Sequence, residues 1–285
     1  MSIPPTKGAR DLKRAPQARL RAATPLRSLR FIGAYVLANL QAAMEYRVSF
    51  WVQIFTMVAN DSLWLFFWWT YFHQFPLVHG WQSTDIVILW AVAACGFGIS
   101  MGVFGNARQL AALIMNGGLD AYLGMPRYVL LHVCIATSDP AAWGDIIFAV
   151  SAYVLFLHPD LLHFALFVLL VLQVSLIFTA FVVILGSLAF FMGNTEGLAQ
   201  QMLQALTSFS TYPMNIFSGV VRLLLFTVVP AGFISFVPLQ LLRQFTWPLL
   251  GAMVGFTVLI VSVAAGLFQL GLRRYESGNL LGMQG

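Results

Sequence analysis

Charged side chains are scarce in this sequence. Only 9% of its 285 residues are Asp, Glu, Lys or Arg, whereas 60% are hydrophobic. A soluble domain carries roughly 25% charged residues, so no ordinary globular core explains such a shortage over this length. Strand-like alternation of polar and apolar residues is also absent, which argues against a transmembrane barrel. The sequence therefore predicts an all-α polytopic membrane protein.

Patterns that carry catalysis or hold metals are missing as well. The chain has no GxxxxGK[ST] phosphate loop and no HExxH motif, and no Ser/His/Asp set can be placed at one depth. Its two cysteines, Cys95 and Cys134, have no metal-like neighbours and are read as small buried apolar residues. The five histidines are scattered along the chain. We therefore expect no catalytic residue, no metal site and no cofactor in this chain.

Long apolar segments are present instead. A spanning helix takes roughly 20 mostly apolar residues, and this criterion predicts six spans, at about 50–72, 84–106, 142–157, 161–188, 197–213 and 246–270. The region 214–244 is apolar but interrupted, and irregular backbone at membrane depth is tolerated only where protein or water covers it. It is predicted to be an outer re-entrant hairpin. Its marker residues are Tyr212, Pro213, Arg222, Pro230 and Pro238. An alternative places 197–213 on the inner surface and makes 219–241 the fifth span.

The distribution of positive charge orients these spans. Residues 1–24 form a basic tail, and 25–47 carry an apolar stripe typical of an amphipathic helix at the inner membrane surface. Thirteen of the fifteen Lys and Arg residues fall on one side, and only Arg222 and Arg243 fall on the other. The positive-inside rule then places both termini in the cytoplasm. The tail lacks any base-reading pattern, so we expect it to contact anionic lipid and not nucleic acid.

The first predicted span carries an acid and a cluster of aromatic residues. Asp61 is the only acid deep in it, and an intramembrane carboxylate is a functional candidate by default. A hydrogen bond to a neighbouring helix or to water is the alternative, and the sequence offers Asp61 no charged partner. Trp64, Trp68 and Trp69 form either an interfacial belt or a stacking surface for substrate. These four residues are our candidates for a substrate pathway.

A short polar segment, 108–127, separates the second and third spans. It reads RQLAALIMNGGLDAYLGMPR and contains two helical pieces too short to cross a bilayer. Such a segment can lie along the membrane surface and offer a small docking surface to a partner.

Three motifs give the chain a resemblance to a known family. They are GGLDAYLGMP at 117–126, YPMNIFSGVVRLLLFTVVPAGFISFVP at 212–238 and GLRRYESGN at 271–279. Over residues 25–280 the chain resembles the ABC-2 type permeases, which are membrane subunits of ATP-binding-cassette transporters, and in particular a bacterial branch that ends in RRYESGN. The resemblance implies a type V exporter-like fold with an interface helix, six spans, a coupling helix and a re-entrant hairpin.

The same resemblance implies partners and roles. Residues 108–127 become the coupling segment, with contact residues Arg108, Leu119, Asp120, Tyr122, Leu123, Pro126 and Arg127. ATP and Mg²⁺ would be bound by separate cytoplasmic ATPase subunits, and a second permease, identical or related, would complete a dimer in the bacterial inner membrane. Export of a hydrophobic or amphipathic substrate is the expected function. An intramembrane enzyme and a structural or receptor-like membrane protein remain as alternatives.

Overall fold

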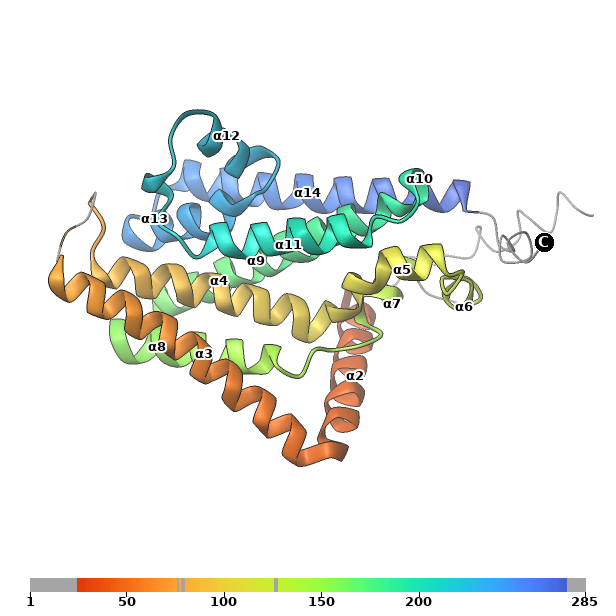
Figure 1. The fold of residues 1–285 in the computed structure, drawn as a ribbon, viewed down its shortest axis with the longest axis horizontal. Helices are drawn as coiled ribbons and strands as arrows, with labels where there is room; N and C mark the ends of the chain where they lie inside the picture. The colour runs from red at the N-terminus through yellow and green to blue at the C-terminus, as the bar shows by residue number, and fades with distance from the viewer. Residues whose placement is uncertain (1–24, 76, 78–79, 126–127, 276–285) are drawn as a thin grey trace, which may run out of the picture.

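The computed structural model describes residues 25–275 except 76, 78–79 and 126–127, and the described residues contain helices and no strands. The predicted basic tail 1–24 lies outside them, as do Pro126, Arg127 and residues 276–285, which include the end of the RRYESGN motif and the short C-terminal tail expected at 281–285. Most of the long helices run side by side, and one long helix crosses an end of this bundle (Figure 1). The prediction of an all-helical membrane protein is therefore confirmed at this level.

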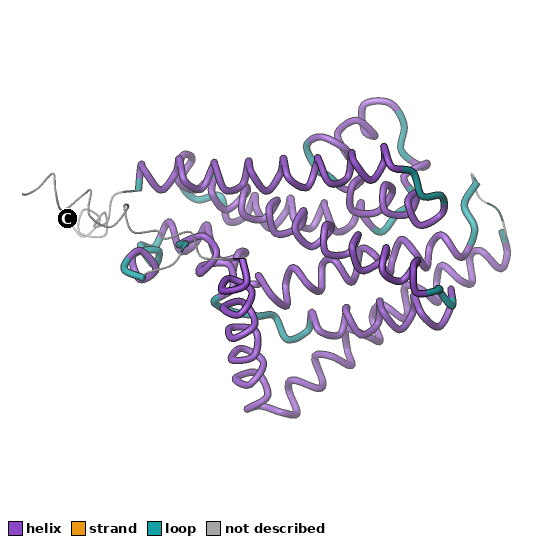
Figure 2. The backbone as a smooth tube through the Cα atoms, turned by 180° about the vertical axis from the view of Figure 1, so that it is seen from behind, coloured by secondary structure: helices purple, strands orange, loops and turns teal. Residues whose placement is uncertain are grey.

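The crossing helix is α2 (Pro25–Ala43). It is followed by a 3-10 turn, η2 (Met44–Tyr46), and then by the long helix α3 (Arg47–Gln74). The chain turns sharply between α2 and α3, so that α2 lies at a steep angle to the bundle (Figure 2). This arrangement is the one expected of an interface helix leading into a first span.

The centre of the bundle is α4 (Ser83–Phe104), which packs most extensively on α8 (Ala142–Leu157) and α9 (Leu161–Ser187). Glycines allow these helices to approach closely. A Cβ on Gly96 would lie 2.3 Å from Cγ1 of Val174 in α9. The last long helix, α14 (Trp247–Arg274), packs on the other side of α9.

Short helices form the end of the bundle beside α2. They are η3 (Gly105–Gln109), α5 (Leu110–Met115), α6 (Asp120–Leu123) and α7 (Val129–Ile135). The side chain of Asn106 donates to the carbonyl of Val133 at 2.7 Å and accepts from the hydroxyl of Thr137 at 3.0 Å. These bonds attach η3, and with it the end of α4, to α7 and to the linker that enters α8.

The region between α9 and α14 is irregular. It contains α10 (Ala189–Met192), α11 (Glu196–Ser210), η4 (Met214–Ile216), α12 (Gly219–Thr227), the π-helical turn η5 (Gly232–Phe236) and α13 (Val237–Arg243). Helix α11 lies lengthwise beside α9 (Figure 1). The pair formed by α12 and the helix of η5 and α13 is bent by 76°, which fits either a broken span or a re-entrant loop.

Four helical stretches in the described residues are long and apolar enough to cross a membrane, or five if the bent pair counts as one span. The four lie within Arg27–Gln74, Ser83–Met115, Leu161–Met192 and Trp247–Arg274. Helix α8 is apolar but has only 16 residues, and α11 has only 15 and is less apolar. The predicted set of six spans and the hairpin therefore stay predictions.

Candidate functional site

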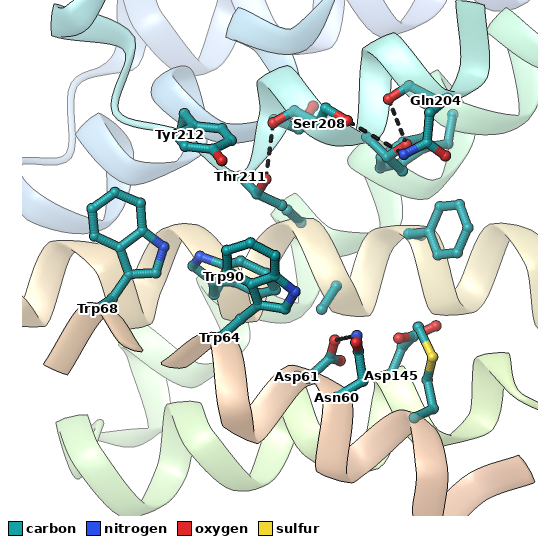
Figure 3. A pocket seen from close by; sticks show the side chains of 17 residues that line it. Asn60, Asp61, Trp64, Trp68, Trp90, Asp145, Gln204, Ser208, Thr211 and Tyr212 are labelled. Carbon is teal, nitrogen blue, oxygen red and sulfur yellow. Dashed lines mark hydrogen bonds between the residues drawn. The ribbon is translucent and has the colours of Figure 1, made fainter. Parts of the chain in front are cut away.

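A cavity of about 390 Å³ lies at mid-length in the bundle. Helices α3, α4, α8 and α9 provide its floor and walls, and α11 with Thr211 and Tyr212 covers it (Figure 3). It is the strongest candidate for a substrate site, because ligand sites in helical proteins form between helices around a few convergent polar groups. Three of the four predicted pathway residues, Asp61, Trp64 and Trp68, line it.

Two carboxyl groups share one wall of the cavity. Asp61 of α3 and Asp145 of α8 are 4% and 2% exposed, and they lie close enough to interact electrostatically. Oδ1 of Asp61 accepts from Nδ2 of Asn60 at 3.3 Å, and the two carboxyl groups are also hydrogen-bonded to each other. Asp61 remains the only deep acid of its own helix, but a second acid on another helix lies beside it, a partner that the sequence did not reveal.

Close helix packing places Asp145 next to Asp61. A Cβ on Gly144 would lie 2.7 Å from the carbonyl oxygen of Ile54, so α8 touches the backbone of α3 one residue before Asp145. On the opposite side, a Cβ on Gly98 of α4 would lie 3.0 Å from Cβ of Asp145. Two glycines on different helices thus fix the position of the carboxyl pair.

Aromatic rings form the second wall. Trp64 of α3 and Trp90 of α4 stack with centroids 6.0 Å apart, and Trp68 meets Tyr212 edge to face at 6.0 Å. Nε1 of Trp90 is buried and has no hydrogen-bond partner. The fourth predicted pathway residue, Trp69, does not line the cavity; it is 55% exposed and stacks on Phe66 and His73.

The cover over the cavity is polar but uncharged. Thr207 and Thr211 donate to backbone carbonyls within their own segment, at 2.7 and 2.9 Å. Gln204 donates to the hydroxyl of Ser208 at 3.4 Å. The cavity therefore combines two acids, several rings and a weakly polar cover, and no Lys, Arg or His is among its lining residues.

The coupling segment lies away from the cavity, at the end of the bundle near α2 (Figure 1). Among its predicted contact residues Leu119 is fully buried, so its side chain anchors the segment and offers no surface to a partner. Arg108 forms an ion pair with Asp139 at 2.8 Å, which ties the end of α4 to the linker before α8. Leu123 is 38% exposed, and the neighbouring Met125 is 41% exposed.

An aromatic cluster joins the coupling segment to α2. The ring of His132 in α7 lies 5.5 Å from that of Tyr122 in α6, and its Nε2 is hydrogen-bonded to the hydroxyl of Tyr35 in α2. Burial lowers the pKa of His132, which favours the neutral ring. Sequence spacing alone could not reveal this cluster, because its members lie far apart in the chain.

The C-terminal end of α14 also contacts the segment. Burial, together with a side-chain hydrogen bond to Asp120 and the charge of that residue, raises the pKa of Tyr275 to about 12. Asp120 is therefore engaged within the chain, through a residue of the RRYESGN motif.

At the opposite end, an ion pair holds the broken region to α4. Arg243 of α13 pairs with the buried Asp85 and packs over the ring of Trp81 at 5.6 Å. Asp85 also forms a capping box with Gln82 at the start of α4. Local sequence patterns could not reveal this pair, because its members are separated by 158 residues.

The marker residues of the broken region differ in their surroundings. Pro213, Pro230 and Pro238 are buried, and Arg222 packs over the ring of Phe236 at 5.5 Å. Tyr212 alone among the five lines the cavity. Elsewhere in the part of the chain that the structure describes, no cluster of three or more His, Cys, Asp or Glu could hold a metal ion.

An all-helical bundle with several spanning-length apolar helices and a polar cavity at mid-length defines an integral membrane protein suited to transport. Comparison with known families supports this class. Residues 58–279 match the family described as ABC-2 family transporter protein, and the chain belongs to this family. No curated protein and no solved structure matches it.

Family membership confirms the resemblance and assigns the chain to the transport membrane subunits, which are not themselves catalytic. It also implies partnership with ATP-binding-cassette ATPase subunits in general.

Proposed function

We propose that this chain is the permease subunit of an ATP-binding-cassette exporter in the bacterial inner membrane, with both termini in the cytoplasm. Separate cytoplasmic ATPase subunits bind ATP and Mg²⁺ and drive it, and a second permease completes the pathway. The substrate enters the cavity between α3, α4, α8, α9 and α11. Asp61, Trp64 and Trp68 are the pathway residues of this proposal, and Asp145, Trp90 and Tyr212 join them.

The observation that carries the proposal is the construction of the coupling segment. Its surface, from Asp120 to Met125, is exposed except at Tyr122. Its interior is fastened to the bundle by the fully buried Leu119 and by the contact between Tyr122 and His132. A segment that is exposed outside and rigidly attached inside suits the transfer of motion from a docked partner.

Two connections lead from this segment towards the cavity. The pair of Arg108 and Asp139 joins the end of α4 to the linker that enters α8, and both helices line the cavity. The bond between His132 and Tyr35 joins α7 to α2, which continues into α3. A partner that binds one arrangement of these elements more tightly than another would shift the population of cavity states.

Exposed apolar surface supports a second permease. The most apolar parts of Arg27–Gln74 and of α14 are each only 22% buried within the protein, whereas the most apolar part of the stretch that contains α4 is 78% buried. Lipid covers such faces in a monomer, and part of them is available to a second permease. We propose that α3 contributes to this contact, because it combines the largest exposed aromatic surface with a wall of the cavity.

The sequence left an intramembrane enzyme as an alternative, but it showed no second catalytic group that could act together with Asp61. Asp145 supplies one, and neighbouring carboxyl groups can share a proton in acid–base catalysis. Family membership nevertheless assigns the chain to transport, and the aromatic wall suits holding a ligand intact.

The proposal is tested by purifying the tagged protein from membranes of its source organism. An ATP-binding-cassette ATPase should co-purify and hydrolyse ATP, and Leu123→Asp should remove it. Leu123 is exposed, so this change places a charge in the docking contact without altering the core, and a loss of about 2 kcal/mol or more is expected for a central apolar contact. Tyr122 suits the test less, because it packs on His132.

Leu161→Asp serves as the matched control. Leu161 is 85% exposed and lies beside the turn at the other end of the bundle. ATPase retention by the Leu161 variant and loss by the Leu123 variant would support docking at the coupling segment. Retention of both binding and hydrolysis by the Leu123 variant would place docking elsewhere.

A further inference from the structure

The charge of the cavity wall is unbalanced. Asp61 and Asp145 are both more than nine-tenths buried and neighbour each other, yet no cationic side chain is among the lining residues. Buried carboxylates in proteins are normally paired with a cation or take up a proton. Arg108 and Arg243 are paired elsewhere, with Asp139 and Asp85 respectively.

One polar atom of the aromatic wall has no partner in the protein. Nε1 of Trp90 is buried and lacks a hydrogen-bond partner, and Trp90 lines the cavity, whereas Asp61 is hydrogen-bonded to Asn60 and Asp145. A buried donor without an acceptor is unfavourable, so a ligand that brings an acceptor to this atom gains interaction energy there. This atom points to a ligand independently of the acidic pair itself.

The aromatic wall selects among ligands. Trp64, Trp90, Trp68 and Tyr212 surround the same cavity, and the faces of such rings attract cations. The stacked arrangement of Trp64 and Trp90 also matches flat or aryl groups. Acids with aromatic rings on an otherwise apolar wall form a site for a cation that is itself largely hydrophobic.

We propose that this cavity binds a hydrophobic organic cation, such as a substituted ammonium or phosphonium compound carrying aryl groups. The proposal rests on the proposed function and specifies its substrate class. The volume, about 390 Å³, falls in the range of roughly 300–1,000 Å³ typical of sites for small organic molecules. The carboxyl pair balances the charge of the ligand, and the rings cover its apolar groups.

The first experiment measures binding to the full-length protein in lipid nanodiscs. Tetraphenylphosphonium is the probe, and tetraphenylborate has the same shape with the opposite charge. Saturable binding of the phosphonium, at least about tenfold tighter than that of the borate, is expected. Equal binding of the two ions would overturn the proposal, and this comparison requires no variant.

The second experiment replaces the two carboxyl groups one at a time. Asp61→Asn and Asp145→Asn keep the side-chain volume, and each should weaken phosphonium binding by about tenfold or more. Asp160→Asn is the matched control, because Asp160 caps α9 at an exposed turn outside the cavity and Asn is an equally good cap. Unchanged phosphonium binding in both cavity variants, at wild-type thermal stability, would overturn the proposal.

A neutral aryl glycoside provides the remaining comparison. If it binds as tightly as the phosphonium and keeps its affinity in Asp61→Asn, the cavity recognises rings and hydroxyl groups, and the cation proposal fails. The same preparations are assayed for the co-purified ATPase. Loss of cation selectivity with the ATPase still bound rejects only the substrate class, whereas absence of any ATPase rejects the proposed function.

Discussion

At the scale of single residues, two glycines determine whether the carboxyl pair can form. Gly144 brings the backbone of α8 against α3, and Gly98 brings α4 against Asp145. Without these close approaches, the two acids would lie on helices held apart by side chains. Their position is therefore as much a product of small residues as of the acids themselves.

Gly144→Ala should destabilise the protein by about 1–3 kcal/mol, the usual cost of overpacking. The added Cβ would lie 2.7 Å from a backbone oxygen and 2.8 Å from Cβ of Met57, so α3 and α8 must separate. Thermal unfolding in detergent measures the effect. Gly255→Ala in α14 is the control, because its Cβ would meet nothing within 4 Å; it should be neutral or stabilising, and an equal loss in both variants would contradict the argument.

His132 should make stability depend on pH. Because burial lowers its folded pKa from the ordinary value of 6.5, the unfolded chain binds the proton more readily than the folded one. Its contribution is therefore complete above about pH 6.5 and is lost as the pH falls towards the lowered value. Tyr35 and Tyr122 face its ring.

The measurement compares melting temperatures at about pH 7.5 and pH 5.5, either side of the ordinary histidine value. The wild type should lose more stability on acidification than His132→Gln, which keeps a hydrogen-bonding side chain but does not titrate. The same pH response in both proteins would show that protonation of His132 is not coupled to folding.

At the scale of elements, the bent region between α12 and α13 depends on one ion pair. Asp85 is buried and its partner Arg243 is partly exposed. Removing the cation leaves a buried charge without compensation, which costs about 3 kcal/mol. Arg243→Gln should therefore lower the melting temperature strongly, while Arg243→Gln combined with Asp85→Asn should recover part of the loss. A double variant no more stable than the single variant would show that the pair is not coupled.

Elements were predictable where apolar pattern and length act locally. The predicted interface helix and the apolar spans at 84–106, 161–188 and 246–270 each coincide with a helix, because about 20 apolar residues admit few other structures in lipid. Helix α11 and the bent pair could not be settled from sequence. Helix α11 has only 15 residues and the pair is bent by 76°, so each is compatible with more than one path relative to the membrane.

The candidate site was only half predictable for a related reason. Asp61 and the tryptophans beside it stand out within one apolar segment, but Asp145 lies near the start of another helix, where an acid is common. Its pairing with Asp61 depends on contacts between separate helices. The same holds for the contact of His132 with Tyr35, which spans 97 residues.

At the scale of the whole molecule, the two ends of the bundle differ in what they can bind. One end carries α2, the coupling segment and the end of α14, and the other carries α12, α13 and the pair of Asp85 and Arg243 (Figure 1). The cavity lies between them. This arrangement suits a transporter in which an ATPase binds at the end that carries the coupling segment, and it requires that this end face the cytoplasm.

Single cysteines test this orientation. The native Cys95 and Cys134 are 3% and 4% exposed, and burial raises the pKa of Cys134 to about 12, so an impermeant maleimide should ignore both in intact cells. Gly124→Cys lies at an exposed site with open space around it, and it should react only after the cytoplasmic side is made accessible. Leu161→Cys, beside the turn after α8, should react from outside.

Ser218→Cys separates the two topologies that the sequence left open. If α11 crosses the membrane, as its position lengthwise beside α9 favours, the exposed position 218 lies outside and should react together with position 161. If α11 lies on the inner surface and the bent pair is the fifth span, position 218 should instead follow position 124. Reaction of position 124 from outside would reverse the orientation and remove the coupling segment from the reach of any cytoplasmic ATPase, because a docking site must face the compartment of its partner.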